Sequence, residues 1–336
     1  MSIPKRSLPL DLFKVFLSFL VVCIHFAGEA YAHFPLYRLA VPMFFMISGY
    51  FNYHRDHALR LKKAKGFLKR SLGYLIIGFG LYVVFDFFLC YAEGKGVGYY
   101  FTTLFHDDLF LDLFYLNTPI TYSGYQLWFL IALTVLALVH LLFVKYKKEK
   151  WYYLLVPALF TIYFFFSGYM RLLQYTDMPI RYTRNAMVFG LPNFALGYLL
   201  AKHLKEKGFK AGKKLLFLTL GLLFFFLQIP ESKIVVMEMY LSTVLSGVFF
   251  LLFFTSFKTG GSLYYKIFGK DLSFYVYILH VGVGIVLGKF CTYESPMVKC
   301  LAVFAVSVVL YMILYRIVPP FVKLLKKGWR LLPEFS

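Results

Sequence analysis

Long apolar stretches, separated by short polar segments, run through the whole chain. A helix that crosses a bilayer needs about 20 mainly apolar residues, and about ten stretches approach that length. The pattern therefore predicts an all-α integral membrane protein, a bundle of about ten transmembrane helices. The expected spans are residues 9–28, 35–53, 71–92, 125–145, 151–168, 185–203, 214–230, 237–257, 271–290 and 298–320.

These stretches fill nearly the whole of residues 1–336, which predicts a single transmembrane domain with no soluble extracytoplasmic domain. The first span is long, lacks a small-residue cleavage site and is followed closely by the second. We therefore expect it to be a membrane helix and not a cleaved signal peptide.

The composition agrees with this class, because 60% of the residues are apolar and only 15% are charged. The formal net charge is +20, and most of the 36 Lys and Arg residues fall in alternate polar segments. Such a bias marks the cytoplasmic loops of a membrane protein. It predicts that both termini are cytoplasmic, and it explains the charge without nucleic-acid binding. The basic segments are residues 1–8, 54–70, 145–150, 202–213, 258–270 and 321–336.

The four cysteines form neither a CxxC motif nor a Cys/His cluster with metal-ligand spacing. We therefore expect no metal site. A disulfide between two of these cysteines cannot be inferred from the sequence, since it depends on distances.

The first expected span carries a polar stripe. At 100° per residue, Lys14 and His25 differ by about 20° around the helix, and Asp11 and Ser18 fall within about 40° of His25. A rise of 1.5 Å per residue puts His25 roughly 22 Å from the cytoplasmic start of the helix and Lys14 about 16 Å below it. Polar side chains are costly inside a bilayer, so the stripe is a functional candidate. Alternatively, Lys14 reaches the inner headgroups and His25 hydrogen-bonds a neighbouring helix.

The second expected span is unusually polar. It carries Arg38 near its outer end, Pro42 in its outer third, and Ser48 and Gly49 near its inner end. Pro42 is expected to weaken the helix, and Gly49 to allow close approach of another helix or of a bound chain. We expect this span to form a second wall beside the polar stripe.

Other polar residues within or beside the expected spans define a second candidate site. Among them, His280 lies near the middle of its span and could pair with His25 across the bundle or simply pack. The residues of this second site are His280, Asp86, Glu238, Arg184 and Asn185.

Several segments, in this order, resemble the integral-membrane acyltransferase type 3 family. The first two are "LPLDLFKVFLSFLVVCIH" and "RLAVPMFFMISGYF", followed by "KKAKGFLKRSLGYL", "QLWFLIALTVLAL", "RNAMVFGLPNFALGYLLAK" and "DLSFYVYILH". The sequence is also similar to the membrane portion attached to the serine racemases of vancomycin-resistant bacteria. One position departs from the family pattern: the arginine of the opening motif is Lys14 here. Lysine keeps the charge but loses the planar bidentate fork.

The resemblance implies an acyltransferase of the bacterial inner or plasma membrane, usually an O-acetyltransferase. The expected donor is acetyl-CoA or another acyl-CoA, and the expected acceptor is a hydroxyl of an envelope glycan or a lipid-linked sugar. No permanently bound cofactor is implied.

His25 is the expected catalytic residue, as a general base or as an acyl relay. Lys14 and Arg38 would stabilise phosphate or oxyanion charge, and Asp86 or Glu238 would orient the imidazole. The phosphates of CoA are expected at basic residues of the inner segment, which also suit anionic lipid. These are Lys62, Lys63, Lys65, Lys69 and Arg70.

Two further functions fit the same pattern. Broken helices and polar residues near the middle of the membrane also suit a transporter-like module for a small molecule such as an amino acid, without acyl transfer. A structural subunit of an envelope assembly is the other alternative, and it predicts that no single membrane histidine matters.

Overall fold

The computed structural model describes most of the chain. Within the described residues the chain consists of helices, including short 3-10 and π segments, and contains no strand. This confirms the all-α expectation. The described residues are 7–28, 34–96, 98–99, 111–117, 119, 121–173, 179–207, 213–257, 262–268 and 271–329. Much of the interval between the expected spans 71–92 and 125–145 lies outside them.

Each expected span coincides with a helix. Six helices are long and apolar enough to cross a membrane: Leu8–Phe26, His57–Ala92, Tyr125–Lys145, Lys214–Ile234, Leu263–Phe290 and Pro296–Ile317. The other four expected spans coincide with shorter helices. In chain order the main elements are α1 (Leu8–Phe26), η1 (Pro35–Leu39), α3 (Ala40–Asn52), α4 (His57–Ala92), η3 (Tyr125–Leu127), α7 (Trp128–Lys145), α8 (Tyr152–Ser167), α9 (Ile180–Thr183), η6 (Ala186–Gly190), α10 (Leu191–Lys207), α11 (Lys214–Ile234), α12 (Leu241–Thr255), α13 (Ser262–Phe268), α14 (Leu272–Phe290) and α15 (Pro296–Trp329).

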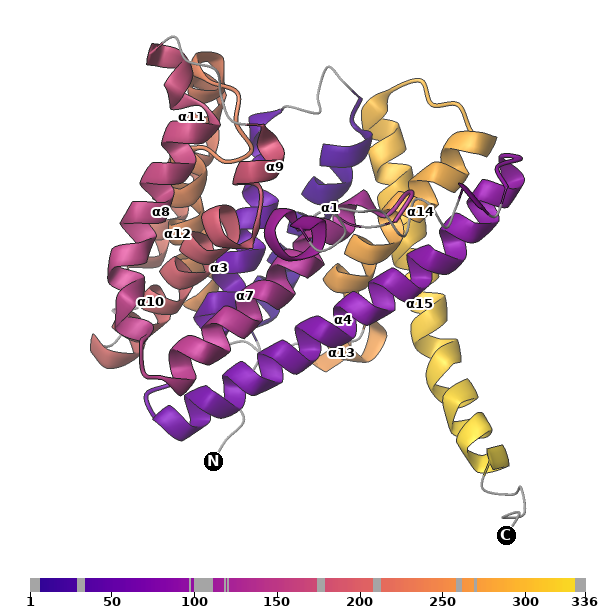
Figure 1. The fold of residues 1–336 in the computed structure, drawn as a ribbon, viewed down its shortest axis with the longest axis horizontal. Helices are drawn as coiled ribbons and strands as arrows, with labels where there is room; N and C mark the ends of the chain where they lie inside the picture. The colour runs from indigo at the N-terminus through magenta and orange to yellow at the C-terminus, as the bar shows by residue number, and fades with distance from the viewer. Residues whose placement is uncertain are drawn as a thin grey trace.

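The helices form two groups joined at the centre of the molecule. In Figure 1, α3, α8, α10, α11 and α12 lie on the left, while α14 and α15 lie on the right. Helix α1 contacts α3 on one side and α14 and α15 on the other. Helix α4 runs obliquely across the front and packs along α7. The polar side chains near the centre of the molecule come mainly from α1, α3, α4 and α14.

The start of α4 corrects the sequence prediction. The basic segment 54–70 was expected to be a polar loop, but α4 begins at His57 and continues to Ala92. The Asp56 carboxylate caps this helix by accepting a hydrogen bond from the Leu59 N–H at 2.8 Å. The segment is rich in Leu, Lys, Arg and Ala, which have high helix propensity. Hydropathy alone does not detect a helix that continues past the apolar region.

Helices α3 and α10 cross with their backbones in contact. A Cβ added to Gly49 would lie 1.9 Å from the Phe194 carbonyl oxygen, and one added to Gly197 would lie 2.0 Å from the Met46 carbonyl oxygen. Glycine is therefore required on both helices at this crossing. Gly49 was expected to admit a neighbouring helix or a bound chain, and the neighbour is helix α10.

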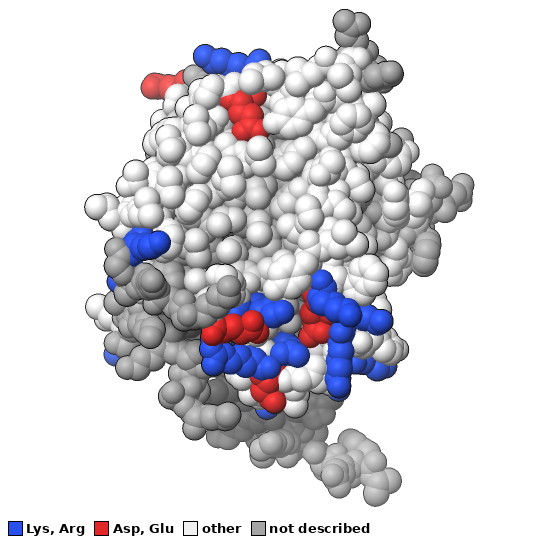
Figure 2. Space-filling model, turned by 90° about the vertical axis from the view of Figure 1, so that its left-hand side faces the viewer, with Lys and Arg blue, Asp and Glu red and all other residues white. Residues whose placement is uncertain are grey.

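The surface has the charge distribution of a membrane protein. Seen from the side of α8 and α11, a broad band of uncharged residues covers the molecule, and charged side chains gather below it with a few above (Figure 2). Many large apolar side chains are exposed, including Leu154 on α8 and Phe226 on α11. Apolar surface of this extent requires a bilayer around the bundle.

Candidate functional site

Two histidines from opposite ends of the chain meet inside the bundle. His25 lies near the end of α1 and His280 in the middle of α14, and their ring centroids are 5.3 Å apart with 29° between the ring planes. His280 is fully buried, whereas His25 is half-buried. The structure therefore brings together the two histidines that the sequence singled out.

The backbone of α14 fixes the proton position on His280. Nδ1 lies 2.6 Å from the Tyr277 carbonyl oxygen and 3.2 Å from the Val276 carbonyl oxygen. Carbonyls only accept, so Nδ1 carries the proton in the neutral ring and Nε2 presents a lone pair. Nε2 is buried and has no hydrogen-bond partner within the described ranges. An unpaired acceptor of this kind is uncommon and is available to a neighbouring donor.

Aromatic and cationic groups surround His25. The Tyr125 ring packs edge-on against it, with 5.0 Å between the ring centroids. The charges of Arg184 and Arg38 act on the imidazole through space. Arg184 lies over the ring of Trp128, 5.2 Å from its centroid. In the part of the chain that the structure describes, no carboxylate hydrogen-bonds to His25.

Asp86 and Glu238 were expected to orient the imidazole, and neither does so directly. Glu238 lies in the segment before α12 and pairs with the Arg38 guanidinium at 2.6 Å. Asp86 is fully buried on α4 and accepts hydrogen bonds from the backbone N–H groups of Tyr122 (2.8 Å) and Ser123 (3.1 Å), and from the Ser123 hydroxyl. Asp86 therefore anchors the turn that leads into Tyr125.

We expect Asp86→Asn to lower the free energy of unfolding by about 1–3 kcal/mol, because a buried amide cannot replace all three acceptor contacts. Thermal unfolding of the purified protein in detergent measures the loss. Asp271→Asn is the matched control, since Asp271 is exposed and its side chain does not cap α14. Equal stability of the two variants would contradict the anchoring role of Asp86.

The Asn185 side chain also hydrogen-bonds to nearby backbone groups. Its side chain accepts hydrogen bonds from the N–H groups of Met187 and Val188, each at 2.9 Å, and donates to the Tyr182 carbonyl at 2.8 Å. It caps the π segment η6, which continues into α10. Asn185 therefore sets the start of α10, and Arg184 is the member of this pair that lies near His25.

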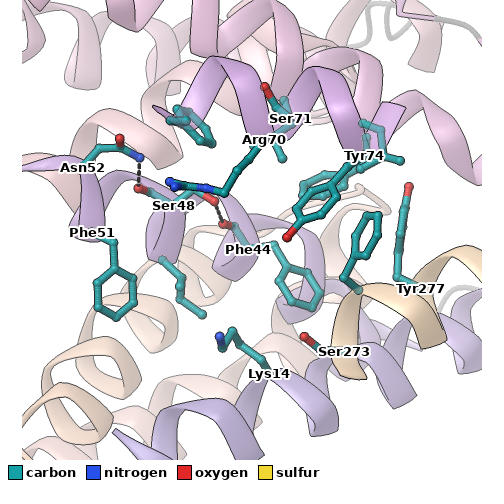
Figure 3. A pocket seen from close by; sticks show the side chains of 16 residues that line it. Lys14, Phe44, Ser48, Phe51, Asn52, Arg70, Ser71, Tyr74, Ser273 and Tyr277 are labelled. Carbon is teal, nitrogen blue, oxygen red and sulfur yellow. Dashed lines mark hydrogen bonds between the residues drawn. The ribbon is translucent and has the colours of Figure 1, made fainter. Parts of the chain in front are cut away.

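A cavity of about 250 Å³ lies between α1, α3, α4, α7 and α14. Lys14 from α1 and Arg70 from α4 reach into it from opposite walls (Figure 3). The Ser48 hydroxyl is bonded to the Phe44 carbonyl at 2.8 Å, and the Asn52 amide to the Ser48 carbonyl at 2.8 Å. The lining is otherwise largely aromatic and aliphatic: Phe44, Ile47, Phe51, Phe67, Tyr74, Phe129, Leu130, Leu133, Phe274 and Tyr277, with Ser71 and Ser273.

One end of this cavity lies beside the histidine pair. Tyr277 lines the cavity, and its ring centroid is 6.1 Å from that of His280. The Tyr277 hydroxyl donates to the Gln126 carbonyl, which ties α14 to η3, just before α7. Ser273, Tyr277 and His280 thus follow one another along α14, from the cavity to the histidines. Tyr277 therefore separates the cavity from His280.

The polar stripe on α1 is divided between these two regions. Lys14 pairs with Asp11, which also accepts a hydrogen bond from the Tyr265 hydroxyl at 2.6 Å. Ser18 turns back to the Val15 carbonyl at 2.7 Å and is fully buried. Lys14 therefore belongs to the cavity and His25 to the histidine pair, with Ser18 packed between them.

The basic residues expected to bind CoA phosphates lie in three different settings. Arg70 lines the cavity, while Lys62, Lys65 and Lys69 are exposed along α4. Lys63 instead donates to the Phe51 carbonyl at 2.9 Å, at the end of α3.

A second lysine, which the sequence analysis did not single out, supports the same end of α3. Lys205 donates to the Tyr53 carbonyl at 3.0 Å, and burial lowers the pKa of Lys205 to about 8, with a smaller effect from the nearby Lys63. Both lysines act on the carbonyls that the end of a helix leaves unpaired.

Other residues of the cavity were not predicted from the sequence. Ser71 and Tyr74 lie three positions apart on α4, and Ser273 and Tyr277 four apart on α14. Each pair therefore shares a helix face. This spacing could have identified a polar face on each helix, but it does not show which helix faces meet in the bundle.

The fold and the site together define a class: an integral membrane protein with a histidine pair beside a cationic cavity. The family described as an acyltransferase domain matches residues 9–331, so the chain belongs to the acyltransferase type 3 family. Searches of curated proteins and of solved structures found no match.

Proposed function

We propose that this protein is an O-acyltransferase of the cell membrane. Acetyl-CoA or another acyl-CoA is the donor, and a hydroxyl of a cell-envelope glycan or lipid-linked sugar is the acceptor. The observation that carries the proposal is the adjacency of the Lys14/Arg70 cavity to the His25/His280 pair. Membership of the acyltransferase type 3 family supports the reaction class.

The cavity suits the donor because its lining is mostly apolar and carries the cationic side chains of Lys14 and Arg70. Lys14 and Arg70 would attract the phosphates of CoA, and the exposed Lys62, Lys65 and Lys69 would extend that field beyond the cavity. The apolar lining would accept the pantetheine arm. If the basic segments face the cytoplasm, as the positive-inside rule predicts, the donor reaches the cavity from that side.

The histidines supply the proton chemistry. His25 removes the proton from the acceptor hydroxyl as its oxygen attacks the thioester carbonyl, the carbon–sulfur bond breaks, and the CoA thiolate leaves and takes up a proton. In the alternative relay, His25 is itself acylated first and then passes the acyl group to the hydroxyl. The positive charges of Arg184 and Arg38 stabilise the negative oxygen that develops on the carbonyl.

The decisive experiment separates acyl transfer from transport. Membranes that contain the wild-type protein are supplied with radiolabelled acetyl-CoA, and both free CoA and base-labile acetate on envelope glycans are measured against membranes from a deletion strain. We expect both products to increase together. Movement of a solute across the membrane without CoA release would favour the transporter alternative and overturn the proposal.

Filling the cavity tests the donor site. Ser48→Trp places a large ring in the cavity, and we expect a rise of about tenfold or more in the KM for acyl-CoA, because donor contacts are lost before the chemical step. Leu72→Trp is the control, since Leu72 is exposed on the outer face of α4. Steady-state CoA release measures both variants. An unchanged KM in a folded Ser48→Trp protein would place the donor elsewhere.

A further inference from the structure

A second cavity, of about 320 Å³, lies between α4, α14 and α15. Its lining is apolar except for the hydroxyl of Tyr82, which donates to the Ile278 carbonyl at 2.9 Å and accepts from the Gly282 N–H at 3.1 Å. The cavity therefore offers no unpaired polar group, and its chemistry suits a hydrocarbon chain. The lining residues are Leu81, Tyr82, Phe85, Leu279, Gly282, Val283, Val286, Leu287, Val306 and Leu310.

This cavity opens sideways from the bundle. Leu81, Val286 and Val306 come from three different helices around the cavity and are 41%, 43% and 41% exposed. All three helices are among the six that are long and apolar enough to cross a membrane. The opening therefore faces the hydrocarbon of the bilayer, from which a lipid chain can enter without crossing water.

Positive charge lies beyond one end of the cavity. Lys289 is two residues past the lining residue Leu287, and it shares the Glu93 carboxylate with Lys95, at 3.5 Å and 3.0 Å respectively. A third lysine, Lys299 at the start of α15, lies 4.0 Å from the position that a Cβ of Gly288 would occupy. Lys299 forms no ion pair among the described residues. We call Lys95, Lys289 and Lys299 the lysine collar; two of its ammonium groups share the Glu93 carboxylate.

The collar lies close to the histidine pair. The Lys299 ammonium is 5.4 Å from the centroid of the Phe26 ring, and that ring is 6.3 Å from the His280 ring, centroid to centroid. Gly284 makes room for this arrangement, because a Cβ there would lie 2.1 Å from the Phe26 ring. An anionic group held by Lys299 would thus be separated from the histidines by one aromatic side chain.

We propose that the apolar cavity and the lysine collar bind one anionic phospholipid of the surrounding bilayer. One hydrocarbon chain fills the cavity along α14, and the phosphate lies between Lys289 and Lys299. Charge complementarity selects this occupant: the collar has an excess of positive charge, and membrane lysines near an interface attract anionic headgroups. The site is independent of the proposed acyl transfer, so either can fail alone.

The test compares lipid binding to the purified full-length protein by native mass spectrometry in a neutral detergent. Phosphatidylglycerol is the anionic probe and phosphatidylcholine the zwitterionic one. We expect phosphatidylglycerol to bind the wild type more tightly, and the double variant Lys289→Ala/Lys299→Ala to lose about tenfold or more in its affinity. Lys147→Ala/Lys148→Ala, in the turn after α7, is the charge-matched control and should bind as the wild type does. Equal binding of the two lipids, or an unaffected collar variant, would overturn the proposal.

A second variant tests the cavity separately from the charge. A Cβ at Gly282 would meet Phe85 only at 3.7 Å, so Gly282→Leu can extend into the space that the chain would fill. We expect this variant to weaken phosphatidylglycerol binding about tenfold. Gly80→Leu is its control, because nothing lies within 4 Å of a Cβ at Gly80. Unchanged binding in a folded Gly282→Leu protein would show that the lipid chain does not occupy the cavity. If that variant does not fold, the comparison of the two lipids and the collar variant still test the proposal.

Discussion

Replacing His25 by alanine is expected to reduce acyl transfer by about 10²- to 10⁴-fold, the usual contribution of a positioned general acid or base. The reason is geometric. His25 is the half-buried member of a stacked histidine pair, lies beside Tyr125 and is exposed to the positive charge of Arg184. The measurement is base-labile acetate on envelope glycans in a deletion strain that expresses each variant, normalised to the amount of protein in the membrane.

His203→Ala is the control for this result, because His203 is exposed on α10, away from the pair. It should leave transfer unchanged. Equal acetate in the His25→Ala and wild-type strains would exclude a catalytic role for His25. A larger loss in His280→Ala than in His25→Ala, with both proteins folded, would assign the base to His280, whose Nε2 has a free lone pair.

The largest effect on folding is expected at the crossing of α3 and α10. Gly197→Ala adds a Cβ only 2.0 Å from the Met46 carbonyl oxygen, a backbone atom that cannot turn aside as a side chain could. We expect the free energy of unfolding to fall by about 3 kcal/mol or more, at the upper end of overpacking costs. Gly49→Ala should behave in the same way. Denaturant unfolding in detergent and the yield of membrane-inserted protein measure both.

Gly80→Ala provides the comparison, because a Cβ at Gly80 meets nothing within 4 Å. Alanine is the better helix former, so this change should be neutral or stabilise α4 by about 0.5–1 kcal/mol. If Gly197→Ala and Gly80→Ala proved equally stable, the two helices would not be in backbone contact.

Most of the helices could be predicted because hydropathy reports burial in a bilayer residue by residue. The ends of the helices could not, and α4 is the clearest case. Its first 14 residues, from His57 to Arg70, are strongly basic, so their hydropathy resembles that of a loop. Their helix propensity and the Asp56 cap extend the helix all the same. The expected number and orientation of membrane crossings stay predictions.

The candidate site could be predicted where the spacing of polar residues along a single helix was enough to place them on one face. The spacing of Lys14 and His25 on α1 placed them on one face. In the structure Lys14 lines the cavity, and His25 stacks against His280. Contacts between helices were not predictable. Nothing local in the sequence shows that Asp86 bonds the turn at Ser123 or that Glu238 pairs with Arg38, because both contacts depend on packing between distant segments.

The glycine crossing also has a consequence for motion. Helices α3 and α10 touch backbone to backbone, so they can neither rotate nor slide past each other without a clash, and they must move as one body. The cavity wall that carries Ser48 is then its fixed wall. Any widening that admits a donor then falls to the other walls, among them α4, which carries Arg70 and many exposed side chains. The backbone amides of α3 and α10 would then be among the last to exchange with solvent.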